Sequence, residues 1–386
     1  MDAFLNPNVR RDDGYRGLFE AEEYRDVASF YDARHDAPPT PLVSLPGLAA
    51  QLSLGGVHLK DESARFGLSA FKIAGARYAI HRIGADALRS GIVCATAGNH
   101  GRAVARAARE IGVSCTVFLP APHERASDLE RRTRSARVEG MRQDGARTVD
   151  VAGSYEEAVA EAAAYARRER AMVISDTSWP GYERIPGLVM QGYTAIMREA
   201  LRQLPAPPTH VFVQAGVGGV AAAVAGHLAL VLGDRRPTFV VVEPARAACL
   251  YETARAGHPV KISHGEPTVM AMLECYEPSL VAWRVLSRVA DAFMTVDEDD
   301  AVAVMNRLSR PAGSDPAIVA GESGGVGLAG LIRAAADPGI RVALDLNEAS
   351  PVFVINTEGA TDPESYAELV GMTPGAVATH AERADA

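Results

Sequence analysis

Residues 210–232 read HVFVQAGVGGVAAAVAGHLALVL, and this stretch decides the fold. Its first five residues form a short apolar run typical of a buried strand, and Gly216 to Gly219 predict a tight turn. The alanine-rich remainder has the length and composition of a helix. A strand that passes through a glycine turn directly into a helix is the repeating unit of α/β proteins with parallel sheets.

The same alternation runs through most of the 386 residues. Further strand-like runs occupy residues 92–95, 114–119, 148–151, 172–175, 239–242 and 352–356, and helical patterns occupy residues 102–109, 154–168 and 302–308. We therefore expect an α/β chain of two domains with mainly parallel twisted sheets flanked by helices. Residues 88–186 hold four of the strands and are expected to form a small domain, while residues 1–87 and 187–386 form the large one.

Composition excludes several classes of function. The formal net charge of -9 argues against a nucleic-acid or anionic-membrane partner. The chain contains no apolar run of membrane-spanning length, and its start lacks the basic segment and apolar core of a signal peptide. We expect a soluble cytoplasmic protein. The four cysteines, Cys94, Cys115, Cys249 and Cys275, lack metal-ligand spacing, so no metal is expected and a Cys249–Cys275 disulfide remains the alternative to four buried thiols.

Lys72 is one of three lysines in a chain with 36 arginines, and it lies in the apolar, glycine-flanked segment from Ser69 to Gly75. A guanidinium group serves wherever charge alone is needed. An ammonium group can also lose its proton and attack a carbonyl carbon, so Lys72 is a candidate nucleophile. The alternative is a partly buried lysine whose amine reaches solvent from the start of a helix.

The turn from Gly216 to Gly219 enters a helix, where free N–H groups and the positive end of the helix dipole can hold a phosphate. A dinucleotide site is the rival interpretation, because Glu243 closes the next strand near where a ribose-binding acid belongs. A turn without any ligand is the third.

Two other strands end in polar loops. Thr96, Ala97, Asn99 and His100 follow the strand at 92–95, where exposed N–H groups could hold a carboxylate, although Asn or His at a helix start is more often a cap. Asp176 follows the strand at 172–175. The carboxyl ends of parallel strands carry the acids and bases of many α/β enzymes, but aspartate is also an ordinary loop residue.

Taken together and in order, six segments resemble fold type II pyridoxal phosphate enzymes, the tryptophan synthase β-like group, and the closer match is to diaminopropionate ammonia-lyases. These segments are residues 59–72, 176–183, 190–193, 214–219, 321–324 and 356–359. The resemblance covers roughly residues 30 to 365.

The resemblance implies a role for each candidate residue. Lys72 would hold pyridoxal 5'-phosphate as a Schiff base, and Asp176 would take the α-proton of an L-amino acid. The implied cofactor-binding residues are Lys72, Phe71, Asn99 at the ring oxygen, Gly216, Val217, Gly218 and Gly219 at the phosphate, and Thr357 at the pyridine nitrogen. The implied substrate-binding residues are Ser69, Thr96, Ala97 and His100. The large domain would bind the cofactor, the small domain would face the substrate, and the enzyme would be a homodimer.

The implied reaction is α,β-elimination on a small L-amino acid, with 2,3-diaminopropionate giving pyruvate and ammonia as the leading assignment. A dehydratase acting on a β-hydroxy amino acid such as 3-hydroxyaspartate, serine, threonine or phenylserine is the alternative within the class. An NAD-dependent oxidoreductase and a catalytically silent relative are the alternatives outside it.

Two departures from the family pattern matter. Ala97 stands where the family has an aspartate that serves the D-isomer, so we expect turnover of D-diaminopropionate to be lost or feeble. The second departure is an arginine-rich segment after Pro120 that carries Arg125, Arg131, Arg132, Arg134, Arg137 and Arg142. These arginines either form a solvated face or bind a second substrate carboxylate, which would point to a dicarboxylic amino acid.

Overall fold

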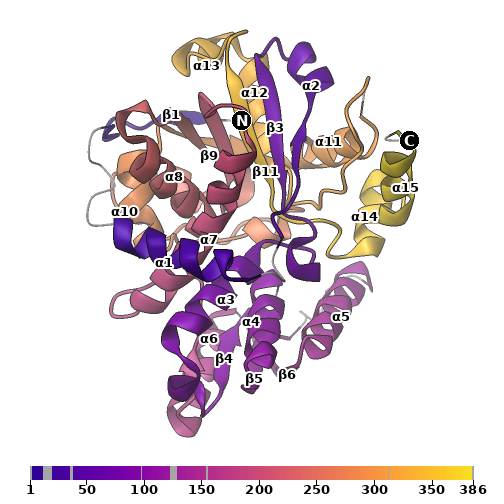
Figure 1. Ribbon diagram of the computed structural model, residues 1–386. Helices are drawn as coiled ribbons and strands as arrows, with labels where there is room; N and C mark the ends of the chain where they lie inside the picture. The colour runs from indigo at the N-terminus through magenta and orange to yellow at the C-terminus, as the bar shows by residue number, and fades with distance from the viewer. Residues whose placement is uncertain are drawn as a thin grey trace.

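The computed structural model describes residues 2–11, 20–34, 38–96, 98–121, 128–153, 155–311 and 313–384. Two sheets organise the chain (Figure 1). The larger sheet has the strand order β1-β10-β9-β8-β11-β3-β2, in which the five inner strands are parallel and both edge strands are antiparallel. Its strands are β1 (Ala3–Leu5), β2 (Leu42–Ser44), β3 (Gly56–Asp61), β8 (His210–Gln214), β9 (Thr238–Pro244), β10 (Ala292–Val296) and β11 (Pro351–Asn356).

The smaller sheet is wholly parallel, with the order β6-β5-β4-β7. Its strands are β4 (Ile92–Ala95), β5 (Cys115–Pro120), β6 (Ala146–Val151) and β7 (Met172–Val173). Mainly parallel sheets agree with the expectation from the alternating sequence pattern. Because parallel strands need long crossover connections, each sheet is covered by helices.

The helices, together with short 3-10 turns, connect these strands. They are α1 (Ala21–Asp32), α2 (Pro46–Gln51), α3 (Lys72–Ile83), α4 (Asn99–Glu110), α5 (Asp128–Gln143), α6 (Tyr155–Glu169), α7 (Arg184–Gln203), α8 (Gly219–Leu232), α9 (Cys249–Ala256), α10 (Leu280–Val289), α11 (Glu298–Ser309), α12 (Val326–Ala336), α13 (Pro338–Ala343), α14 (Pro363–Val370) and α15 (Pro374–Ala384). Within the described ranges, no helix is long and apolar enough to cross a membrane.

Alternate residues of the large sheet enter two different cores. Val211 and Val213 of β8 pack with α7, α8 and α10 on one face, whereas Phe212 packs with α2, α11 and α12 on the other. The smaller sheet is covered by α3, α4 and α5 on one face and by α6 on the other. Both sheets therefore have helices on both faces, as a buried parallel sheet requires.

Helix α3 joins the two layers, and its first residue is Lys72. Ala74 and Tyr78 pack into the core beneath the large sheet, while Ile73 and Ile80 pack into the core of the small sheet. Its neighbour α7 approaches so closely that a Cβ atom on Gly192 would lie 2.6 Å from the carbonyl oxygen of Ala74. Glycine is therefore required where the two helices cross, and α3 and α7 lie side by side in Figure 1.

Candidate active site

Lys72 and Asp176 meet between the two sheets. Lys72 opens α3, and Asp176 lies three residues after the end of β7. The distance from Lys72 Nζ to Asp176 Oδ2 is 2.5 Å, and the two side chains are 22% and 18% exposed. The other lysines have different surroundings. Lys60 is fully buried and its amine donates a hydrogen bond to the carbonyl oxygen of Thr40, whereas Lys261 is exposed. Lys72 is thus a partly accessible amine with a carboxylate beside it.

The charges of this pair control each other's protonation. Burial lowers the pKa of Lys72, but the Asp176 carboxylate outweighs burial and holds that pKa well above its ordinary value. Burial raises the pKa of Asp176, but the positive charge of Lys72 is the largest of the opposing influences, and together they hold that pKa well below its ordinary value. While Lys72 is a free amine, the two groups form an ion pair.

Two buried polar atoms border this pair without a hydrogen-bond partner among the described residues. His100 Nε2 lies 3.0 Å from the carbonyl oxygen of Ile174, which can only accept, so Nε2 carries the proton. Its other nitrogen, Nδ1, is unpartnered and lies 3.9 Å from Asp176 Oδ2. The hydroxyl group of Tyr193, a side chain 1% exposed, is also unpartnered, and burial raises its pKa. Buried polar groups of this kind usually have a partner.

The Tyr193 ring contacts two other parts of the site. It packs edge-on against Phe71 with ring centroids 4.9 Å apart, and its Cε2 atom lies 3.7 Å from where a Cβ atom on Gly219 would stand. Tyr193 was not among the site residues predicted from the sequence. The only signal was its position in the segment 190–193 that carries part of the family resemblance.

The glycine turn between β8 and α8 lies against the same region. Gly218 has φ +99° and caps α8, a conformation that only glycine adopts readily. A Cβ atom on Gly216 would stand 2.8 Å from the sulfur of Cys275. A Cβ atom on Gly219 would stand 3.9 Å from the carbonyl oxygen of Asp176, so the start of α8 faces the Lys72–Asp176 pair. The N–H groups of its first turn have no carbonyl within the helix to bond.

Thr357 follows the end of β11 and is held from three sides. Its Oγ1 accepts a hydrogen bond from Gln214 Nε2 at 2.8 Å, and its carbonyl oxygen accepts from Phe71 N at 3.1 Å. Its own N–H donates to the carbonyl oxygen of Gly324 at 3.0 Å. Because Oγ1 already accepts, its hydroxyl hydrogen can donate to an acceptor nitrogen.

The loop from Thr96 to His100 leads from β4 into α4. Thr96 Oγ1 accepts a hydrogen bond from Gly98 N at 3.2 Å, and Asn99 Nδ2 donates to Glu358 Oε2 at 2.5 Å. Ala97 lies outside the described residues. Ser69 joins from the segment before Lys72, where its carbonyl oxygen accepts from Gly359 N at 3.0 Å. The structure thus brings together the loops that follow β4 and β11 and the segment before Lys72. Glu358, which joins two of them, was not predicted from the sequence.

Glu243, the key residue of the dinucleotide interpretation, is not available to a ribose. It is fully buried, and its two oxygens accept hydrogen bonds from Leu250 N at 2.8 Å and Tyr251 N at 2.6 Å near the start of α9. Both carboxylate oxygens are therefore used within the protein. Glu243 is a structural acid that ties β9 to α9.

The arginine-rich segment forms α5 and contacts neighbouring protein groups. Arg132 pairs with Glu364, Arg134 with Asp150, and Arg142 with the hydroxyl of Thr148. Arg137 faces the loop before α12, where its Nη2 lies 3.5 Å from Glu322 Oε1. Arg125 lies outside the described residues. Arg137 Nε is buried without a hydrogen-bond partner among the described residues, so the second-carboxylate hypothesis stays a prediction.

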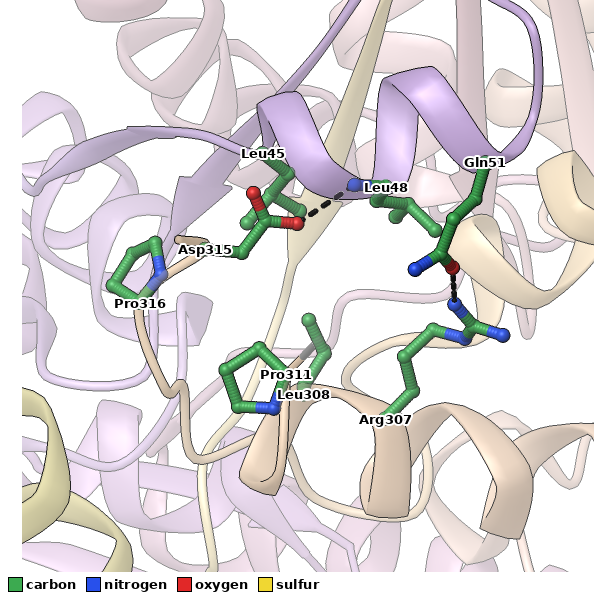
Figure 2. A pocket seen from close by; sticks show the side chains of 8 residues that line it. All are labelled: Leu45, Leu48, Gln51, Arg307, Leu308, Pro311, Asp315 and Pro316. Carbon is green, nitrogen blue, oxygen red and sulfur yellow. Dashed lines mark hydrogen bonds between the residues drawn. The ribbon is translucent and has the colours of Figure 1, made fainter. Parts of the chain in front are cut away.

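The four cysteines are free thiols, so the structure contains no Cys249–Cys275 disulfide. No cluster of metal-ligating side chains occurs among the described residues. A separate cavity between α2 and α11 holds about 10 Å³, room for one water molecule (Figure 2). Asp315 in its wall accepts from Leu48 N at 2.8 Å, so it caps α2. This cavity is too small for a cofactor.

Residues 34–357 match the family model described as "Pyridoxal-phosphate dependent enzyme". The chain belongs to this family. It is 34% identical over 385 residues to diaminopropionate ammonia-lyase of Escherichia coli (strain K12), with 94% of each chain covered. It is also 34% identical to the enzyme of the same name from Salmonella typhimurium (strain LT2), with 89% of this chain and 91% of the relative covered.

A solved structure gives the same result. The crystal structure of the Escherichia coli diaminopropionate ammonia lyase in complex with an aminoacrylate-PLP azomethine reaction intermediate superposes with a TM-score of 0.85. The two chains are 33% identical, and 96% of each is covered. The expected fold type II architecture and the expected cofactor, pyridoxal phosphate, are confirmed.

The residues of this site fit the family's cofactor. Lys72 offers an amine to the aldehyde, the first turn of α8 offers N–H groups to a phosphate, and the hydroxyl of Thr357 can donate to the pyridine nitrogen. The unpartnered Tyr193 hydroxyl and His100 Nδ1 lie next to Lys72 and Asp176, where a polar ligand would satisfy them. Three features of the site therefore fit the cofactor: the amine of Lys72, the N–H groups at the start of α8, and the buried polar atoms without partners.

Proposed function

We propose that this protein is a pyridoxal phosphate-dependent ammonia-lyase that converts L-2,3-diaminopropionate and water to pyruvate and ammonia. The observation that carries the proposal is the contact of 2.5 Å between the amine of Lys72 and the carboxylate of Asp176, beside a glycine turn suited to phosphate. The names of the relatives, identical at 34% over nearly the whole chain, support the choice of substrate.

Lys72 forms the covalent attachment, with Phe71 and Asn99 beside the ring. Gly216, Val217, Gly218 and Gly219 bind the phosphate through their backbone, and Thr357 donates to the pyridine nitrogen. The hydrogen bond from Gln214 Nε2 to Thr357 Oγ1 supports this last role, because it leaves the threonine hydrogen free to point at an acceptor. When bound, the cofactor supplies an electron sink for the negative charge left on the substrate α-carbon.

Asp176 acts as the base that takes the α-proton of the L-isomer. The ammonium of Lys72 is the largest influence that lowers the pKa of Asp176, and burial is the largest that raises it. Once Lys72 carries no positive charge, burial dominates and the pKa of Asp176 moves upward. A higher pKa makes the carboxylate a stronger base, as proton abstraction near neutral pH requires.

Lys72 has a second role after the substrate has displaced it. Its free amine then lies beside Asp176, can take up the proton that Asp176 has removed, and can pass it to the departing β-amine. We assign substrate binding to Ser69, Thr96, Ala97 and His100, and the start of α4 suits the substrate carboxylate. The unpartnered Nδ1 of His100, 3.9 Å from Asp176 Oδ2, supports a polar ligand at this place.

We further propose that residues 88–186 form a small substrate-side domain and that residues 1–87 with 187–386 form the large cofactor-binding domain. The separate four-stranded sheet within the first range supports this division. A homodimer is the assembly we propose, since closed symmetric dimers are the commonest oligomers. The four free thiols support a reducing compartment, the cytoplasm.

The test is reconstitution with pyridoxal phosphate. The loaded protein should be yellow, lose that absorbance on treatment with borohydride, and release pyruvate from L-2,3-diaminopropionate. Lys72→Ala should abolish all three properties, and Lys261→Ala, which changes an exposed lysine, should preserve them. A colourless protein that binds NAD would overturn the proposal.

A further inference from the structure

Two carboxylic acids that the proposed reaction does not use are buried beside Asn99. Glu322 lies in the turn before α12 and is 6% exposed, and Glu358 follows Thr357 and is 2% exposed. Charged groups are rarely buried this deeply without partners. Their contacts therefore indicate what they do.

Glu358 uses both carboxylate oxygens as acceptors. Its Oε2 accepts from Asn99 Nδ2 at 2.5 Å, and its Oε1 accepts from Ser323 N at 3.3 Å. Glu322 Oε1 lies 3.5 Å from Arg137 Nη2. Asn99 and Arg137 belong to α4 and α5 on the small sheet, whereas both acids belong to loops of the large sheet. The cluster therefore connects the two halves of the site.

The protonation of the two acids is linked through their charges. Burial raises the pKa of Glu358 to about 8, with a further rise from the charge of Glu322 and an opposing effect from Arg137. Burial also raises the pKa of Glu322, which Arg137 lowers and Asp362 raises. Two neighbouring carboxyl groups facing one guanidinium group titrate together as a pair.

We propose that Glu358 is a positioning residue that fixes the side-chain amide of Asn99 toward the cofactor's ring oxygen, with Glu322 and Arg137 holding Glu358 in place. An amide can turn over and exchange its oxygen and nitrogen. When Glu358 is ionised, its oxygen facing Asn99 can only accept, and only the nitrogen of the amide can donate, so Glu358 selects one of the two orientations. The second N–H of Asn99 then remains available to the ring oxygen. This inference rests on the proposed function, since it needs the cofactor at this site.

Glu358→Gln tests the two-acceptor geometry directly. Glutamine has one acceptor oxygen and one donor nitrogen, so it can satisfy either Asn99 Nδ2 or Ser323 N, but not both. We expect the dissociation constant for pyridoxal phosphate to rise about 5- to 10-fold, the effect of one lost hydrogen bond. Glu364→Gln, an exposed acid of α14 paired with Arg132, is the matched control and should leave the constant unchanged.

The second measurement is the absorbance of the bound cofactor over a pH range that brackets the Glu358 pKa of about 8. If Glu358 acts through Asn99, Glu358→Gln shifts this titration in the wild-type background and has no further effect in Asn99→Ala. A purely structural role for Glu358 would change folding stability equally in both backgrounds and leave the titration in place. That result would overturn the inference.

Glu322→Gln provides a second variant that leaves both Glu358 hydrogen bonds intact. Removing the neighbouring negative charge should lower the pKa of Glu358 and shift the absorbance titration to lower pH. An unshifted titration in a folded Glu322→Gln protein would contradict the inference. A wild-type protein that binds no pyridoxal phosphate would instead refute the proposed function, so the two failures are distinguishable.

Discussion

Replacing Asp176 by asparagine separates the proposed base from the cofactor-binding residues. The amide keeps the shape of the side chain and an oxygen that can accept from Lys72 Nζ, now 2.5 Å from Asp176 Oδ2. The carboxylate charge is also the largest influence that raises the pKa of Lys72. Its removal lets burial lower that pKa, so the amine becomes neutral more readily and attachment of pyridoxal phosphate should persist.

The catalytic effect of Asp176→Asn should be large. Loss of a positioned general base costs about 10²- to 10⁴-fold in rate. At 1.36 kcal/mol per factor of ten, this corresponds to about 3 to 5 kcal/mol of activation free energy. The KM for L-2,3-diaminopropionate should change far less, because Asp176 is assigned no contact with the substrate carboxylate.

The assay follows two signals in the loaded protein. Pyruvate formation gives kcat, and loss of the substrate's α-hydrogen signal in deuterated water gives proton abstraction separately from elimination. Asp150→Asn, which changes a half-exposed aspartate paired with Arg134, is the control. An Asp176→Asn protein that exchanges the α-hydrogen at the wild-type rate would refute the assignment of the base.

Four further predictions test other parts of the structure. Gly216→Ala should weaken pyridoxal phosphate binding at least about 10-fold in an absorbance titration, because its new methyl group would stand 2.8 Å from a neighbouring sulfur and displace the turn. Burial raises the pKa of Glu243 to about 8, so this acid stays protonated in the folded chain at pH values where it has ionised in the unfolded chain. The free energy of unfolding should therefore fall as pH rises from about 4.5 to 8, and Glu243→Gln should flatten this slope in urea unfolding. Arg65→Ala should lower the free energy of unfolding by about 3 to 5 kcal/mol, since it leaves the buried Glu62 carboxylate without its guanidinium partner. Because Ala97 stands where the family has an aspartate that serves the D-isomer, D-diaminopropionate should turn over far more slowly than the L-isomer, and equal rates would contradict this.

The sequence predicted strands best where an apolar run ends in a polar turn. The predicted strands 92–95 and 210–214 coincide with β4 and β8. Strand β3 was not predicted. It contains Lys60, and a charged residue within a short run is typical of an exposed segment and not of a buried strand. In the structure that amine is buried against Thr40 and Gln203, contacts that no local pattern encodes.

Helix α7 was missed for a related reason. Pro186 and Gly192 argue against a helix when they are considered locally. Proline is tolerated here because it lies in the first turn, and glycine is required where α7 crosses α3. The advantage of Gly192 comes from packing, so it is not visible in the local sequence.

The candidate site also contains residues that local sequence patterns predicted and residues that they did not. Lys72 and Asp176 were identifiable because a helix start and a strand end obey local rules that bring such ends together. The contact between Asn99 and Glu358 joins residues 259 positions apart, and neither has a local pattern that names the other. Tyr193 likewise contributes its hydroxyl because α7 crosses α3.

The stoichiometry of products from L-2,3-diaminopropionate tests the proposed elimination at Lys72. Protein loaded with pyridoxal phosphate should release two ammonia molecules for each pyruvate, and Lys72→Ala should release neither. Elimination and hydrolysis at the Lys72 site account for both nitrogen atoms of the substrate. Pyruvate formation that persists in folded Lys72→Ala, or no pyruvate from the loaded wild-type protein, would contradict the account.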